Sequence, residues 1–334
     1  MKLCKRIIAA VVMAAMLALC VPAFAVAEPD YPEVPEGYDG FITFEVSALT
    51  MGWTYLIDPV LVPVHEGETF ITVTERAFEM LDWNYAITTS EYGSYLTGIG
   101  CYETEPFVPD YLMTEILNYP AWAEENFGYS MGEWTGEYDD DEMLTEYEYC
   151  GLSGWMFMVD GASTSDTIDT HVIQIGSVYT WFFTIYGWGM DYGISDGWGY
   201  FPAFDNPMAG VDRTEISRTL AQIDADEELS YNLIVNALEE FVDLLMLFYN
   251  PTSSQADLDA ALAALLTAMD PGSVLMGDVN FDGVVDSSDA LMVLRHAMQI
   301  TQLSDEALAA ADVDGNGVID SSDALMILRA SMDV

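Results

Sequence analysis

The chain has 334 residues, and its 56 Asp and Glu residues against 8 Lys and Arg give a formal net charge of −48. Such a surface repels phosphate groups, which disfavours nucleic acids and anionic membranes as partners, and it attracts divalent cations. Solubility outside a cell explains the negative charge equally well. The length suits two or three domains, and 51% hydrophobic with 13% aromatic residues indicates folded cores rather than disorder.

Residues 1–27 have the pattern of a secretory signal peptide. Lys2, Lys5 and Arg6 form a positive start, residues 7–21 are apolar, and small residues favour cleavage near Ala25 or Ala27. A lipoprotein signal at Cys20 is the alternative, although a small residue is wanted where Leu19 stands. We expect a secreted protein, extracellular or in a cell-surface complex, with no membrane span.

Residues 28–40 are rich in Pro, Glu and Gly and predict an extended linker, and residues 41–200 predict a β-rich domain. Apolar alternation or continuous apolar runs predict strands at residues 41–46, 60–64, 154–161 and 177–186, and helical spacing predicts a helix at residues 72–81. A turn is predicted at residues 65–68, an acidic loop at 137–148 and an irregular segment at 187–207. Trp155 and Trp181 are expected in the core, or else on a face that stacks against a sugar.

Two cysteines, Cys101 and Cys150, remain once the signal peptide is removed. They form either a disulfide, which would stabilise the fold by about 4 kcal/mol on the chain-entropy model, or two buried thiols. Both alternatives stay open at the level of the sequence.

Residues 210–271 predict a small three-helix bundle. Apolar residues at three- and four-residue spacing place helices over residues 213–223, 228–249 and 255–269. Ser254 is placed to cap the third helix, with Asp257 at the third position. The run from Ser254 to Leu262 resembles the FIVAR-type modules of Gram-positive surface proteins, a resemblance that implies a spacer.

Residues 275–334 contain an internal repeat. One copy, DVNFDGVVDSSD, spans residues 278–289, the other, DVDGNGVIDSSD, spans residues 312–323, and Ala-Leu-Met-(Val/Ile)-Leu-Arg follows each. Oxygen ligands at positions one, three, five, seven, nine and twelve of such a loop converge on one point, as Ca²⁺ requires, and glycine permits the sharp turn at position six. Two Ca²⁺ ions are therefore predicted, with ligands at Asp278, Asn280, Asp282, Val284 (backbone carbonyl), Asp286 and Asp289, and at Asp312, Asp314, Asn316, Val318 (backbone carbonyl), Asp320 and Asp323.

The twelfth loop residue is Asp, where an EF-hand has Glu, and no ordinary helix precedes either loop. In these features the segment closely resembles the dockerin family. The resemblance implies an all-α module with two calcium loop–helix (F-hand) repeats that binds a cohesin module of a scaffoldin. The implied cohesin contacts are Ser287, Ser288, Arg295, Ser321, Ser322 and Arg329.

The two arginines have a second interpretation, in which each complements the C-terminus of its helix. The leucines that follow each loop, Leu291, Leu294, Leu325 and Leu328, are expected to form the core of the paired helices.

Residues 41 to about 195 resemble a bacterial domain family of unknown function related to the C-terminal β-domain of transcobalamin. The resemblance implies a β-grasp-like sheet packed on a helix. The family often has Asn-Gly in place of Asp160-Gly161, and Gly-Asp in place of Gly176-Ser177. The residues that carry it are Leu49–Gly52, Pro59, Val64–Glu68, Ser153–Met156 with Asp160-Gly161, and Trp181–Gly187.

The sequence thus predicts a multidomain α+β protein, a secreted component of a cellulosome-like complex whose cargo is a non-catalytic binding or structural module. The alternative is a polysaccharide-degrading glycoside hydrolase, although no nucleophile–base motif is found. A polysaccharide or cell-wall ligand is a further candidate partner. Corrinoid binding is the least favoured function, because no matched residue coordinates cobalt.

Overall fold

Two units make up the structure, a computed structural model: residues 1–265 and residues 266–334. It describes residues 34–91, 93–101, 105–138, 143–194, 199–269, 277–280, 285–303, 305–313 and 317–331. The predicted signal peptide and the start of the predicted linker lie outside the described residues. Among the helices in the described ranges, none is both long and apolar enough to cross a bilayer.

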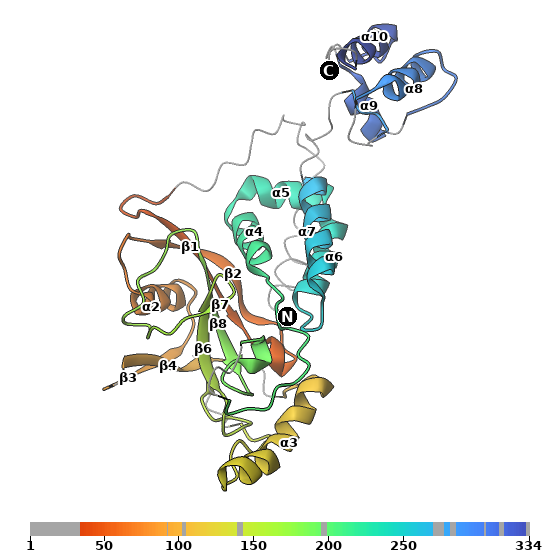
Figure 1. The fold of residues 1–334 in the computed structure, drawn as a ribbon. Helices are drawn as coiled ribbons and strands as arrows, with labels where there is room; N and C mark the ends of the chain where they lie inside the picture. Colours follow the sequence, from red (N-terminus) through yellow and green to blue (C-terminus); the bar gives the residue numbers. More distant parts are fainter. Residues whose placement is uncertain are drawn as a thin grey trace. The chain divides into compact units, whose positions relative to one another are not determined.

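The first unit is built on a five-stranded sheet in the order β2-β1-β8-β6-β7 (Figure 1). Its central strands, β1 (Gly40–Ser47) and β8 (Val178–Thr184), run parallel to each other. The outer strands pair antiparallel, with β2 (Tyr55–Val64) on β1 and β6 (Gly154–Val159) on β8. The two-residue strand β7 (Ala162–Ser163) closes a hairpin with β6. The strands predicted in this part of the sequence are therefore present.

Both faces of the central strand pair are buried, as parallel strands require when each face is covered. On one face, Phe44 packs edge-on against Phe78, and Trp181 stacks on Phe70. Phe70 and Phe78 belong to helix α2 (Phe70–Met80), which matches the predicted helix. On the other face, Glu45 and Thr180 are buried beneath the helices that follow the sheet in the chain.

A second, three-stranded antiparallel sheet has the order β3-β4-β5. Its strands are β3 (Tyr85–Ser90), β4 (Gly93–Gly100) and β5 (Met143–Thr145). The prediction of a loop over residues 137–148 is wrong at β5, because Leu144 is fully buried and the strand pairs with β4. Strands β3 and β4 and helix α3 (Asp110–Phe127), which contains Pro120, are not among the elements predicted from the sequence.

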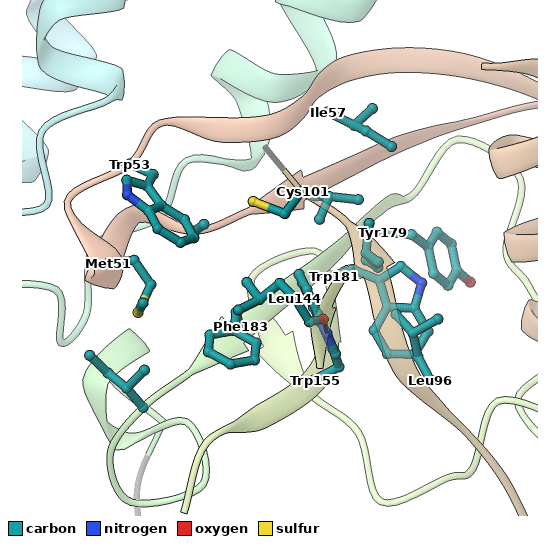
Figure 2. Packing of buried hydrophobic residues seen from close by; sticks show 14 of the residues in the cluster. Met51, Trp53, Ile57, Leu96, Cys101, Leu144, Trp155, Tyr179, Trp181 and Phe183 are labelled. Atoms are coloured by element: carbon teal, nitrogen blue, oxygen red, sulfur yellow. Dashed lines mark hydrogen bonds between the residues drawn. The ribbon is translucent and has the colours of Figure 1, made fainter. Parts of the chain in front are cut away.

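The main core lies between the two sheets and α2 (Figure 2). Trp155 Nε1 donates a 2.8 Å hydrogen bond to the backbone oxygen of Leu144, and Trp181 Nε1 donates a 3.2 Å hydrogen bond to Thr74 Oγ1. Both indole rings are buried, so they fill the core, as expected for large aromatic side chains, and do not form an exposed sugar-stacking face.

Cys101 and Cys150 are both buried thiols and are not joined by a disulfide. Cys150 Sγ donates to the backbone oxygen of Gly132 at 3.4 Å. Burial raises the pKa of the Cys150 thiol to about 11. The sequence left open either a disulfide or two buried thiols, and the structure contains two buried thiols.

Helices follow the sheet: α4 (Thr214–Ala225), α5 (Glu227–Asn236), α6 (Leu238–Phe248) and α7 (Gln255–Met269). The single helix predicted over residues 228–249 is interrupted at Ala237, whose φ of −137° is not helical. At the start of α7, Asp257 N donates to Ser254 Oγ at 3.2 Å, the predicted cap. Helix α4 packs on β2 and β1, and two short 3-10 turns, η1 (Leu49–Met51) and η2 (Met190–Tyr192), complete the first unit.

The second unit is helical within its described residues. Helices α8 (Ser287–Ala297) and α10 (Ser321–Ala330) pack against each other, and α9 (Asp305–Ala311) lies between them in the chain. Helix α9 is not among the elements predicted from the sequence. The small core of this unit consists of Val279, Ala290, Val293, Ala307, Ala310, Ala311, Ala324 and Ile327.

Candidate functional site

The first turns of α8 and α10 have the same geometry, as the sequence repeat predicts. Asp286 and Asp320 are the N-cap residues, with φ, ψ of −136°, −169° and −136°, −168°. Each cap carboxylate accepts a 2.6 Å hydrogen bond from the backbone N–H of the serine two residues later. Each cap N–H in turn donates 2.9 Å to the carboxylate three residues on, Asp289 or Asp323. The ninth and twelfth residues of each predicted loop are therefore locked together in a capping box.

The twelfth residue also holds the beginning of the first loop. Asp289 Oδ1 accepts hydrogen bonds from the backbone N–H groups of Val279 at 3.0 Å and Asn280 at 3.2 Å. In the second loop, Asp312 Oδ2 accepts from the backbone N–H of Gly317 at 2.8 Å. Gly317 has a φ of +81°, the left-handed conformation expected at the sixth loop position. These contacts join the twelfth residue of the first loop to the start of that loop, and the first residue of the second loop to its sixth.

The donor set fits a hard cation such as Ca²⁺. Asp278, Asp289 and Asp323 are 4%, 0% and 0% exposed, and burying a carboxylate is costly unless hydrogen bonds and positive charge compensate it. The basic residues after position 276, Arg295, His296 and Arg329, lie in the last turns of α8 and α10. A helix of eleven residues is about 16 Å long, so each of these cations lies at the opposite end of its own helix from the loop that precedes that helix.

Four predicted ligands, Asp282, Val284, Asp314 and Asn316, lie outside the described residues. Among the residues that are described, no group of three or more His, Cys, Asp or Glu side chains is gathered closely enough to hold a metal. Of the described ligands, the capping boxes bring Asp286 to Asp289 and Asp320 to Asp323, and Asp289 also contacts the backbone of Asn280. The ligand set as a whole stays a prediction.

The residues implied as cohesin contacts all lie exposed on α8 and α10. Ser287 and Ser288 are in the first turn of α8 and Arg295 is in its last, and Ser321, Ser322 and Arg329 are placed in the same way on α10. Positions separated by three, four and seven residues share one face of a helix. Each helix therefore presents its serine pair and its arginine on a common exposed face.

The leucines of the repeat are exposed, so their predicted place in the core is wrong. Leu291 and Leu325 are 46% and 47% exposed, and Leu294 and Leu328 are each 37% exposed. Val293 and Ile327, together with Ala290 and Ala324, fill the core instead, because the two helices approach each other through these residues. Each exposed face therefore carries two leucines between its serine pair and its arginine. We call these two faces together the docking face, after the cohesin contacts that the dockerin resemblance implies for them.

A second candidate lies on the buried polar face of the five-stranded sheet, which the sequence analysis did not identify. A cavity of about 50 Å³ is lined by Glu45 and Thr180 from the sheet, by Tyr192, and by Arg213 just before α4. Burial raises the pKa of the Glu45 carboxyl to about 7. Arg213 donates to the backbone oxygens of Phe248 and Asn250, at 3.3 and 3.0 Å. In the sequence, the alternating polar residues Thr43, Glu45 and Ser47 of the predicted strand indicate that one face of this strand is polar.

Glu45 and Ser217 each keep a buried polar atom without a hydrogen bond. These atoms are Glu45 Oε2 and Ser217 Oγ. A cavity of this size has room for water molecules, which would satisfy both atoms. The cavity therefore fits a hydrated structural polar site that joins α4 to the sheet.

Comparison with known proteins identifies one part of the chain. Residues 276–330 match the model of the dockerin type I domain, which supports a dockerin-containing protein. No match was found among curated proteins. Among solved structures, haptocorrin in complex with Cbi is similar over 44% of this chain and 25% of that chain, with 15% identity and a TM-score of 0.26. This chain thus spans about a quarter of the haptocorrin chain, and at that score no fold or ligand is carried over.

Proposed function

We propose that this protein is a secreted component of a cellulosome-like complex. In this proposal, residues 275–334 attach it to a cohesin module of a scaffoldin, with two Ca²⁺ ions bound. The dockerin type I match over residues 276–330 carries the proposal. The docking face adds support, since the same serine, leucine and arginine residues are exposed at equivalent places on α8 and α10.

Calcium, when bound, supplies the positive charge that stabilises the acidic loops. The capping boxes at Asp286 and Asp320 connect each loop directly to the first turn of its helix. Loss of the cation leaves like charges close together at both junctions, so we expect the orientation of α8 and α10 to depend on it. Attachment to cohesin is therefore expected to be calcium-dependent.

The leucines explain how the docking face would gain affinity. Exposed apolar side chains surrounded by polar ones are typical of protein interaction surfaces, and burying the exposed part of each of these half-buried leucines contributes about 1 kcal/mol. Arg295 and Arg329 add positive charge to a strongly acidic protein, which favours a partner surface with acidic groups. Because the two halves are nearly the same, a half-turn would present an equivalent face, so we propose two alternative binding orientations.

Isothermal titration with a panel of purified cohesin modules tests this proposal on the full mature chain. We expect binding in Ca²⁺ and none in excess EGTA. Replacing Leu291 and Arg295 by Ala in one half, or Leu325 and Arg329 in the other, should leave binding intact, and replacing all four should abolish it. The matched control is Ile300→Ala, which truncates a side chain that is 63% exposed outside the helices. Unchanged binding by the fourfold variant would refute the assigned face, and loss in one single-half variant would refute the two orientations.

For the first unit we propose a non-catalytic binding or structural cargo. Its sheet order, with β1 and β8 parallel at the centre, supports the β-grasp-like domain implied by the transcobalamin-like resemblance. Incubation of the full chain with plant polysaccharides separates this role from the hydrolase alternative. Release of reducing sugar would establish an enzyme, and retention without cleavage would support a binding module.

A further inference from the structure

Four aromatic side chains form a continuous surface strip on the first unit, remote in sequence from the docking face. Trp188, Tyr200 and Tyr129 are 44%, 43% and 59% exposed, and Phe127 is half-buried between them. Consecutive ring centroids are 5.8 Å apart for Trp188–Tyr200, which pack edge to face at 72°, 5.9 Å for Tyr200–Phe127, tilted by 51°, and 6.3 Å for Phe127–Tyr129, tilted by 35°. We call these four residues the aromatic strip. It brings together the end of α3 and the loop segment that follows β8.

A second layer of buried rings supports the strip. Phe201 is 6% exposed, and its ring centroid lies 4.7 Å from that of Tyr119 and 5.2 Å from that of Trp188. Tyr119 Oη donates a 3.1 Å hydrogen bond to the backbone oxygen of Tyr200. The exposed rings are therefore attached to the main core and hold a defined arrangement, which lowers the entropy lost when they bind a ligand.

The backbone that presents Trp188 is unusual. Gly187, Trp188 and Gly189 have φ values of +68°, +51° and +98°, three consecutive left-handed residues of which the tryptophan alone carries a side chain. A non-glycine residue in this conformation typically costs about 1–3 kcal/mol and persists where surrounding contacts hold it, often at binding sites. In this strained conformation the indole ring of Trp188 stays partly exposed to water.

Buried hydrogen bonds hold this turn in place. Gly189 N donates to Thr184 Oγ1 at 2.9 Å, and Thr184 Oγ1 donates to Asp191 Oδ1 at 2.6 Å. Asp191 is fully buried, and its Oδ2 accepts from Ile185 N at 2.9 Å. The strained turn is thus anchored to the end of β8.

We propose that the aromatic strip binds an uncharged polysaccharide chain, whose sugar rings lie against Trp188, Tyr200 and Tyr129. The apolar C–H face of a sugar ring carries partial positive charge, which suits the electron-rich face of an aromatic ring. The proposal names the ligand class of the binding module proposed above and rests on that role. It does not depend on attachment to cohesin.

The negative charge of the protein disfavours an acidic ligand at the aromatic strip. Residues 110–138 and 185–208, which supply the strip, contain no Lys, Arg or His, and the whole chain carries a net charge of −48. Exposed Glu124 lies three residues before Phe127 on α3 and offers an acceptor to a hydroxyl donor. A ligand rich in hydroxyl groups and free of negative charge is therefore favoured over a polyuronic acid.

Binding of the full mature chain to defined glycans tests this inference. The protein is incubated in EGTA with insoluble cellulose, xylan and mannan as uncharged chains, and with polygalacturonate as the acidic one. Soluble oligosaccharides of the retained class are then titrated by calorimetry. We expect retention by at least one uncharged glycan and none by polygalacturonate.

Three variants connect binding to the strip. Trp188→Ala and Tyr200→Ala should each weaken binding about tenfold or more, as truncation of a central aromatic contact does, while Trp188→Phe should retain most of it. Tyr231→Ala is the matched control, because Tyr231 is 47% exposed on α5, away from the strip. Thermal unfolding of each variant confirms that it is folded.

The outcomes separate this inference from the proposed function. Absence of binding to every uncharged glycan, or full binding by the Trp188→Ala, Tyr200→Ala double variant, would overturn the strip and leave cohesin attachment untouched. The strip assignment would also be overturned if polygalacturonate retained the protein better than the uncharged glycans do. It would be overturned likewise if the strip bound a partner protein and no glycan. Release of reducing sugar would overturn the non-catalytic role only.

Discussion

Thr180 Oγ1 donates a 2.5 Å hydrogen bond to Glu45 Oε1, across the parallel pair β8 and β1. This contact places a carboxyl group, 2% exposed, on the buried polar face of the sheet beneath α4. Glu45 is therefore a group whose ionisation is coupled to the folding of the first unit.

Stability of the first unit should fall as the pH rises from about 4.5 to 7. Burial raises the pKa of Glu45 from 4.5 to about 7, so its contribution is complete below pH 4.5 and lost as the pH passes 7. A shift of this size corresponds to about 3 kcal/mol. The pKa values of Asp58 and Asp191, each raised to about 6 by burial, act in the same direction.

Urea unfolding followed by tryptophan fluorescence at pH 5 and pH 8 measures this effect in the first unit, because all eight tryptophans precede residue 199. Glu45→Gln keeps an acceptor for Thr180 but cannot ionise. We expect this variant to lose about 2.5 kcal/mol of the difference in unfolding free energy between the two pH values. An unchanged pH dependence would show that Glu45 does not titrate in the folded protein as described.

Gly52→Ala should destabilise the first unit by about 2–4 kcal/mol. Gly52 has a φ of +70°, and a Cβ atom there would lie 2.0 Å from the backbone oxygen of Phe107. Gly67 is the matched control, with a φ of +84° and no atom within 4 Å of an added Cβ. Gly67→Ala should cost about 1 kcal/mol, from the left-handed conformation alone. Equal losses in the two variants would contradict the close contact with Phe107.

The thiols of the native protein should be unreactive. Cys101 and Cys150 are 2% and 1% exposed, and the pKa of Cys150, raised to about 11, leaves roughly 0.1% thiolate at pH 8. Ellman's reagent should therefore react slowly with the folded mature chain and rapidly with both thiols in denaturant, with glutathione as the reference for a free thiol. Absence of reaction in denaturant until a reductant is added would reveal a disulfide instead.

Removal of calcium should change the second unit and leave the first unit folded. We expect EGTA to lower the helical signal in circular dichroism without changing tryptophan fluorescence, since residues 277–334 contain no tryptophan. Calorimetry should count two ions in the unmodified chain and one each in Asp289→Ala and Asp323→Ala. Asp243→Ala, which removes the same charge from an exposed place on α6, should still bind two. A variant at Asp289 that binds two ions would contradict its assignment as a ligand.

Local patterns predicted much of the first unit. The apolar residues of β1, β6 and β8 and the helical spacing of α2 are evident in the chain, and these elements form where they were expected. Helix α3 and the β3–β4 hairpin were missed. Pro120 interrupts the helical pattern of α3, and the Thr- and Gly-containing strands of the hairpin lack strong apolar alternation. These elements are stabilised by packing against the core rather than by local propensity.

The leucines of the repeat show a different limit. Leu291, Val293 and Leu294 are all apolar, and the sequence alone does not say which of them faces the partner helix. The way α8 and α10 approach each other buries Val293 and leaves both leucines in water. The leucines that were expected in the core are therefore part of the docking face.

The sequence by itself determined the acidic loops and their repeat, because the ligands of a calcium loop lie within twelve residues and their spacing alone sets their convergence. Tertiary structure decided which apolar side chains are exposed on α8 and α10, the burial of Glu45, and the assembly of the aromatic strip from Phe127 and Trp188. Each of these depends on contacts between segments far apart in the chain, and no local spacing encodes such contacts.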